Sequence, residues 1–366
     1  KYQAAVAYDV VNGYWNDGNQ DASTKTEVIT LKDAAGQWDK DGTATITLPA
    51  AGDNPAKGYK ANGSWDNDRT TVSKTDDQTK RTFTYALETN LTVTFDDATL
   101  PYNGKEQSGA ETYQVTLPDG YTLENVSGYT APHGTTVGTY TNGDAEKVTY
   151  KILHGTEDVT DQFTVKFAEG TLTITPIETV IEIIASSDDK NYDGTPLTNS
   201  DYTYTQGVLV NGDQLTAVTS GSQTDVGDGV NTVDGYQIKS TTGEDVTDCY
   251  TVQTKEGKLS VYERQVKITA NNAYKTEGQQ DPDFKAVFGA TIKGAVAGEE
   301  LDFEIVRSNS DDTVGTYADV LTVVPSTTSE VNKNYSIEVV PGTFTIFADQ
   351  KGGPDGGKDA IPDDFQ

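Results

Sequence analysis

Apolar and polar residues alternate in a phrase that the chain repeats three times. The copies align without a gap and read DVTDQFTVKFAEGTLTI, DVTDCYTVQTKEGKLSV and EVNKNYSIEVVPGTFTI, at residues 158–174, 245–261 and 330–346. Each copy holds two runs with an apolar residue at every second position, and a glycine lies between the runs. Such alternation is typical of half-buried strands. The phrase therefore predicts two antiparallel strands joined by a hairpin, and its recurrence predicts a tandem array.

Two further phrases recur upstream of each closing phrase. A tyrosine opens a turn, followed midway by a Val-Gly pair. The first set is PYNGKEQSG, NYDGTPLTN and AYKTEGQQDPDF, at 101–109, 191–199 and 273–284, and the second is TTVGTY, TDVGDG and DTVGTY, at 135–140, 224–229 and 312–317. Asn-Gly and Asp-Gly after tyrosine fit turns that need positive φ. We therefore expect β-rich modules at 1–88, 89–176, 177–263 and 264–348, then a Gly/Asp/Pro linker at 349–366.

The fold class that follows is all-β. No segment shows a long 3.6-residue apolar period with capping signals, so little helix is expected. The links between modules are short and contain no Gly/Ser tract, which favours an end-to-end array with limited swing. From the rise of about 3.3 Å per strand residue, the array should be an elongated rod of about 150 Å.

The first module resembles a known family. The phrases VAYDVVNGYWNDG, KTEVITLKD and GYKANGSWD, at 6–18, 25–33 and 58–66, resemble the internalin-type B-repeat (Listeria–Bacteroides repeat). That resemblance implies a β-grasp-like module of surface proteins of Gram-positive bacteria. In such proteins a phrase like the IPDDFQ at 361–366 often precedes the next B-repeat, so the chain is expected to be about one period of a longer tandem protein.

The other three modules resemble a second family. The phrases YDGTPLT at 192–198 and NYSIEVVPGTFTI at 334–346, together with the ordered set of three repeated phrases, resemble the MBG or YDG-type immunoglobulin-like repeats of bacterial surface proteins. The resemblance implies β-sandwich modules used in tandem in cell-wall or secreted proteins. It carries no shared catalytic residues to this chain.

Charge and composition exclude several classes of function. The net charge of −30 argues against nucleic-acid partners, which need clustered Lys and Arg, and against an anionic membrane surface. The sequence contains no run of about 18 apolar residues, so membrane insertion is not expected. One cysteine and two histidines give no support for nucleophilic catalysis or zinc binding. The closing strands contain no asparagine for a Lys–Asn crosslink. The sequence thus predicts a protein that is not an enzyme.

Calcium is the one cofactor that the sequence raises. Asp355, Asp359 and Asp363 follow one another at four-residue intervals in the acidic tail. An EF-type loop would need an acid or amide at its third position and a glutamate at its twelfth, where this chain has Gly357 and Gln366. The sequence therefore favours a solvated acidic linker over a calcium site.

The candidate binding residues are tyrosines and tryptophans. Tyr121 and Tyr129 fall in the Gly-rich stretch 120–134, which we expect to be a loop, and tyrosine on loops is common in recognition surfaces. Tyrosine is equally a normal half-buried strand residue. All three tryptophans lie in the first module and are expected to be core anchors rather than an exposed carbohydrate platform. They are Trp15, Trp38 and Trp65.

Three functions remain open from the sequence. The first is a non-catalytic stalk segment of an extracellular bacterial cell-surface protein, whose partners are the neighbouring repeats of the same polypeptide. The second is direct binding of a host glycoprotein, immunoglobulin or glycan by these modules. The third is self-assembly of like subunits into a surface filament. The ligand, the source organism and the number of repeats in the parent protein do not follow from the sequence.

Overall fold

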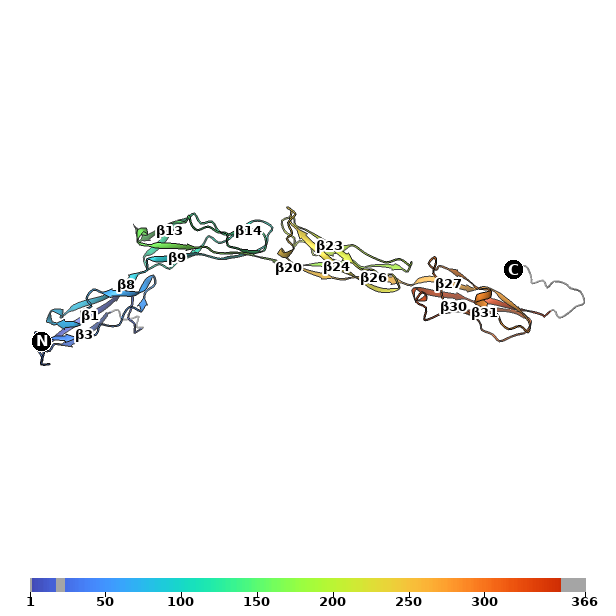
Figure 1. Ribbon diagram of the computed structural model, residues 1–366, viewed down its shortest axis with the longest axis horizontal. Coiled ribbons are helices and arrows are strands. Elements are labelled where there is room, and N and C mark those ends of the chain that lie inside the picture. Colours follow the sequence, from blue (N-terminus) through green and yellow to red (C-terminus); the bar gives the residue numbers. More distant parts are fainter. Residues whose placement is uncertain (1, 18–23, 350–366) are drawn as a thin grey trace, which may run out of the picture. The chain divides into compact units, whose positions relative to one another are not determined.

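The predicted all-β fold is confirmed. The computed structural model describes residues 2–17 and 24–349, and within these ranges the only α-helix is the single turn α1 (Phe284–Val287). The chain forms two compact units, one ending at Ile177 and the other starting at Glu178. Hydrogen-bonded strands fall within four stretches, 3–87, 90–175, 177–262 and 264–347. We call these the first to fourth modules (Figure 1).

The first module is built on one four-stranded sheet in the order β3-β1-β8-β6. Strand β1 alternates buried and partly exposed residues and pairs antiparallel with β3 and parallel with β8. Its strands are β1 (Gln3–Val11), β2 (Gly13–Tyr14), β3 (Thr24–Thr30), β4 (Thr43–Thr45), β5 (Asn54–Pro55), β6 (Tyr59–Trp65), β7 (Thr71–Ser73) and β8 (Thr79–Leu87).

Two of the three tryptophans are core residues. Trp15 is fully buried and stacks on the half-buried Trp65, with 5.9 Å between the ring centroids. The expectation is wrong for Trp38, which is 69% exposed and lies beside Tyr2. A backbone bridge to Lys32 holds Trp38 at the surface.

The second module has three small three-stranded sheets, β12-β9-β18, β10-β19-β15 and β13-β16-β17, besides the pair β11-β14. Its strands are β9 (Asn90–Phe95), β10 (Ala98–Pro101), β11 (Gln107–Ser108), β12 (Tyr113–Gln114), β13 (Tyr121–Ser127), β14 (His133–Gly134), β15 (Gly138–Tyr140), β16 (Thr149–His154), β17 (Glu157–Asp158), β18 (Thr164–Ala168) and β19 (Leu172–Thr175).

The third and fourth modules share one topology of two sheets each. The third has β22-β20-β25 and β21-β26-β24-β23, and the fourth has β29-β27-β32 and β28-β33-β31-β30. Their strands are β20 (Ile177–Ala185), β21 (Asp188–Asn191), β22 (Tyr202–Tyr204), β23 (Gln214–Ser220), β24 (Gly227–Lys239), β25 (Tyr250–Lys255), β26 (Gly257–Tyr262), β27 (Arg264–Ala270), β28 (Ala273–Thr276), β29 (Ala290–Lys293), β30 (Phe303–Arg307), β31 (Gly315–Pro325), β32 (Tyr335–Val340) and β33 (Gly342–Phe347).

The closing phrase is not a hairpin, and this part of the prediction is wrong. Its first strand joins one sheet and its second strand joins the other. In the fourth module β32 pairs with β27 and β33 pairs with β28, both in parallel. The second module repeats this arrangement, with β18 parallel to β9 and β19 parallel to β10. The phrase is therefore a crossover between two sheets.

The glycine inside each closing phrase allows a close approach of two backbones. A Cβ atom placed on Gly170, Gly257 or Gly342 would lie less than 3.0 Å from a carbonyl oxygen near the end of the module's opening strand, that of Asp96, Ala185 or Ala270. None of the three has a positive φ. Lack of a side chain, rather than a left-handed turn, therefore explains the repeated glycine.

The Asp-Val-Thr-Asp segment has a local hydrogen-bonding role. Asp245 Oδ1 accepts from the backbone N–H and the hydroxyl of Thr247, whose Oγ1 accepts from the N–H of Ile238 at 2.9 Å. Asp158 and Thr160 repeat these contacts in the second module. Such local side-chain hydrogen bonds satisfy backbone groups beside a short 3-10 turn. The repeat of this phrase is thus explained by structure.

The strand register corrects one repeat assignment. Tyr102 and Tyr192 each follow the short strand that runs parallel to the last strand of their module, and their N–H groups bond to Thr175 and Tyr262. In the fourth module the corresponding N–H bond, to Phe347, comes from Glu277. The residue equivalent to Tyr192 is therefore Glu277 and not Tyr274, which lies three positions earlier within β28.

Candidate functional site

The predicted tyrosine loop is largely a strand. Residues 121–127 form β13, which pairs antiparallel with β16. The ring of Tyr121 stacks on His154 at 4.4 Å, and Tyr129 stacks on Phe95 at 3.5 Å. The expectation that Tyr121 lies in a loop is wrong, because Tyr121 begins β13, whereas Tyr129 lies after that strand. A binding role for the two residues stays a prediction.

An open hollow of about 450 Å³ lies beside Tyr129 in the second module. The hydroxyl of Tyr129 accepts the N–H of Gly170 at 3.3 Å, and burial raises the pKa of Tyr129. The other polar lining residues come from two separate stretches of the chain, 106–111 and 130–133, and no local sequence signal marks them as one site. These residues are Glu106, Gln107, Ser108, Glu111, Thr130 and His133.

The calcium candidates lie outside the described residues. Asp355, Asp359 and Asp363 all fall within 350–366, and nothing in the structure tests them. In the described ranges no three His, Cys, Asp or Glu side chains gather closely enough to hold a metal ion.

A carboxylate with two tyrosines joins the third and fourth modules, which belong to the same compact unit. Glu299, in the turn before β30, accepts the hydroxyl of Tyr192 on Oε1 at 2.6 Å and the hydroxyl of Tyr335 on Oε2. The two rings meet edge to face at 5.5 Å, and both are 5% exposed. The hydrogen bond to Glu299, followed by burial, raises the pKa of Tyr192. Burial, followed by the same carboxylate, raises the pKa of Tyr335.

A second set of contacts lies close by in the chain. The buried amide of Asn334 accepts the N–H of Val226 at 2.8 Å and donates to Asp225 Oδ1 at 3.0 Å. The Arg264 guanidinium donates to the carbonyl of Tyr192 at 3.4 Å. One hydrophobic cluster runs through both modules, from Leu259 and Val261 to Val266 and Ile268. The joint thus has a continuous core with satisfied polar groups around it.

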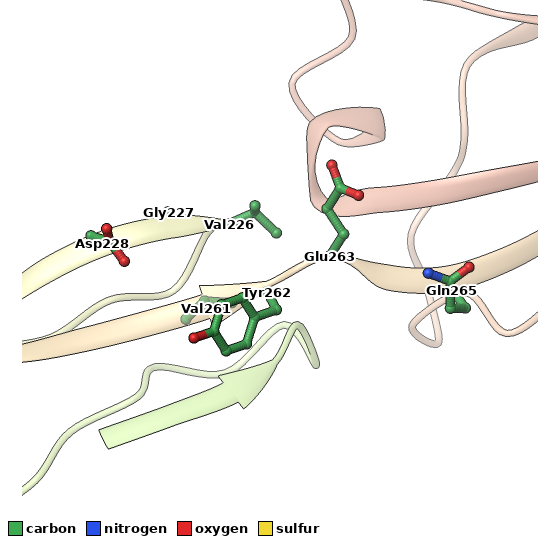
Figure 2. A pocket seen from close by; sticks show the side chains of 7 residues that line it. All are labelled: Val226, Gly227, Asp228, Val261, Tyr262, Glu263 and Gln265. Atoms are coloured by element: carbon green, nitrogen blue, oxygen red, sulfur yellow. The ribbon is translucent and has the colours of Figure 1, made fainter. Parts of the chain in front are cut away.

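The side of this joint carries an open hollow of about 470 Å³ (Figure 2). Figure 2 shows its lining side chains spread along β24, β26 and β27 and the link at Glu263, with Tyr262 and Glu263 directed to opposite sides of the chain. The carboxylate of Asp228 is already bonded to Lys258 and Ser260, at 2.9 and 2.7 Å. The polar groups do not converge on one point, so the hollow has no built ligand site.

A buried ion cluster lies in the fourth module. The Lys275 side chain is 4% exposed and bonds to Asp281 at 2.7 Å and to Asp312, and Arg307 pairs with the same two acids. Both cations lie over the ring of Phe344. Burial by itself would lower the pKa of Lys275, but the hydrogen bonds to the two acids outweigh it and raise that pKa. A protonated lysine of this kind is a structural cation rather than a nucleophile.

Comparison with protein families assigns the fourth module. Residues 266–345 match the family model of the MBG domain (YGX type), a repeat domain typical of surface proteins. The MBG-type prediction is therefore confirmed for this module, and the B-repeat assignment of the first module stays a prediction. No curated protein matches the chain. Among the described residues, no helix is long and apolar enough to cross a membrane.

Proposed function

We propose that the chain is a non-catalytic stalk segment of a large bacterial cell-surface protein, which projects or presents binding regions outside the cell. The MBG domain at residues 266–345 supports this role, because such domains occur as repeats in surface proteins. A stalk must transmit tension from one end of each module to the other, and the strand pairing fits this requirement.

The observation that carries the proposal is that, in every module, one of the first two strands pairs in parallel with one of the last two. The pairs are β1 with β8, β9 with β18, β21 with β26, and β27 with β32. When the two ends of a module are pulled apart, parallel strands slide along each other and their hydrogen bonds are strained together. In an antiparallel hairpin pulled at its open end, the bonds break one after another. Each bond contributes about 1 kcal/mol, so simultaneous loading gives the greater resistance.

Single-molecule pulling tests this proposal with an internal control. The full chain is pulled once by handles at its two ends, and once by handles on cysteines placed at Asp302 and Ser326, which flank the antiparallel pair β30–β31. The buried Cys249 is replaced by alanine in both. We expect higher unfolding forces for end-to-end pulling. Equal or lower forces would overturn the tension-bearing role.

A second function, binding of a ligand by the second module, is favoured by the hollow beside Tyr129. Glu106 and Glu111 line it and would favour a ligand with a cationic or hydroxyl-rich surface, such as a basic peptide or a glycan. The test is a screen of glycans and cationic peptides against the chain and against a Tyr129→Ala, Glu111→Gln variant. Binding that the variant loses would support this function, and its absence from the unchanged chain would remove it.

A further inference from the structure

The surface of the fourth module that meets the third has a defined chemical preference. It presents the carboxylate of Glu299, the hydroxyl of Tyr335 and the backbone N–H of Val296, and that N–H donates to Tyr335 at 2.9 Å. The Tyr335 hydroxyl therefore accepts one hydrogen bond and donates another within its own module. Glu299 Oε1 is the acceptor that receives a donor from the preceding module.

The third module supplies that donor from a fixed position. Tyr192 lies directly after β21, and the turn that follows contains Gly194 with φ +77°. A Cβ atom on Gly194 would lie 3.1 Å from Val296 and 3.5 Å from Glu299 Oε1. The turn therefore lies against the fourth module, and its glycine permits both the positive φ and the close approach.

The residue that corresponds to Tyr192 differs between modules. It is a tyrosine in the second and third modules, Tyr102 and Tyr192, whereas the fourth module has Glu277. A glutamate placed against Glu299 would bring two carboxylates together in a half-buried site. Like charges in such a place repel strongly. The end of the fourth module is therefore incompatible with the surface that the third module occupies.

We propose that the Glu299–Tyr335 surface is a docking site specific for a module end that carries tyrosine at the position of Tyr192. This contact holds the third and fourth modules as one rigid body. The same surface rejects an end that carries glutamate there. The inference concerns the joint alone and does not depend on the stalk function.

Distance measurements between the two modules test the proposal on the full chain. Spin labels are attached to cysteines at Thr216 in the third module and Glu304 in the fourth, both exposed, with Cys249 replaced by alanine. We expect a single narrow distribution of label-to-label distances in the chain without a substitution at the joint. The distribution should broaden in Tyr192→Phe, which removes the hydroxyl that donates to Glu299, and its narrow peak should disappear in Tyr192→Glu.

Two further variants separate docking from simple damage to a module. Tyr317→Phe removes a hydroxyl that donates to the carbonyl of Thr313 at 2.8 Å within the fourth module, and it should keep the narrow distribution. Adding Glu299→Gln to Tyr192→Glu removes the repulsion across the joint and should restore part of the narrow peak, because coupled residues show non-additive effects. The proposal would be overturned if the distance distribution of the chain with Tyr192 and Glu299 intact were as broad as that of Tyr192→Glu. It would also be overturned if Glu299→Gln failed to restore any of the narrow peak.

Discussion

The hydroxyl of Tyr192 lies 2.6 Å from Glu299 Oε1, although 107 residues separate the two in the chain. The same carboxylate accepts the hydroxyl of Tyr335 on its other oxygen. One acidic side chain therefore links the end of the third module to the interior of the fourth. Hydrogen bonds to an ionised acceptor are about twice as strong as neutral ones. The bond from Tyr192 to the Glu299 carboxylate therefore stabilises the joint more than a neutral hydrogen bond would.

The joint should weaken in alkaline solution. The folded chain holds the pKa of Tyr192 and Tyr335 above the usual value of 10.0, so above about pH 10 the unfolded chain loses tyrosine protons that the folded chain keeps. Stability is then fully present below about pH 10 and falls as pH rises further. Urea unfolding of the chain between about pH 8 and pH 11 checks this.

The Tyr192→Phe variant is the matched control for that experiment. It lacks one of the two hydroxyls of the joint whose pKa is raised, so its free energy of unfolding should fall less steeply with pH than that of the unchanged chain. Identical slopes for the two proteins would mean that Tyr192 does not titrate as the geometry requires.

Local pattern predicted the strands but not their partners. Alternation at Phe163, Val165 and Phe167 correctly marked β18, yet its partner is β9, more than 70 residues earlier. A glycine between two alternating runs fits a hairpin and a crossover equally well, because strand period alone does not specify pairing. The Glu299 joint was missed for the same reason. No local signal distinguishes this glutamate from the other acids of the chain.

Replacing the crossover glycine should destabilise its module. In Gly342→Ala the new methyl group would clash with the carbonyl of Ala270, and such overpacking typically costs about 1–3 kcal/mol. Thermal unfolding followed by circular dichroism measures the effect. The control is Gly235→Ala, where no atom lies within 4 Å of the added Cβ. A melting temperature lowered equally in both variants would contradict the close-approach role of Gly342.

The first module should depend on one buried ion pair. Arg81 is fully buried, with Asp76 Oδ1 at 3.7 Å from its Nη2. Burial would raise the pKa of Asp76, but hydrogen bonds from Ser73 and the charge of Arg69 outweigh it and lower that pKa. Asp76→Ala leaves Arg81 as a buried charge without its acid, which costs about 3–5 kcal/mol.

Tryptophan fluorescence isolates this effect, because all three tryptophans lie in the first module. Denaturant unfolding followed at that signal should shift to lower midpoint in Asp76→Ala. The control is Asp41→Ala, whose exposed pair with Lys40 predicts a change within about 0.5 kcal/mol. A midpoint for Asp76→Ala as high as that of the control would show that Arg81 needs no counter-charge.

Lys275 should remain a free amine despite its contact with two acids. Amide formation between its Nζ and the Cγ of Asp312 would release one water, and it requires a neutral amine and a protonated acid. The hydrogen bonds to Asp281 and Asp312 raise the pKa of Lys275, and the bond from Lys275, with help from Arg307, lowers that of Asp312. Both partners are therefore charged at neutral pH.

Intact mass spectrometry should give the mass of the unmodified chain, and digestion should release the peptides of Lys275 and Asp312 separately. A chain lighter by one water, with those peptides joined, would contradict the assignment of this cluster as purely ionic.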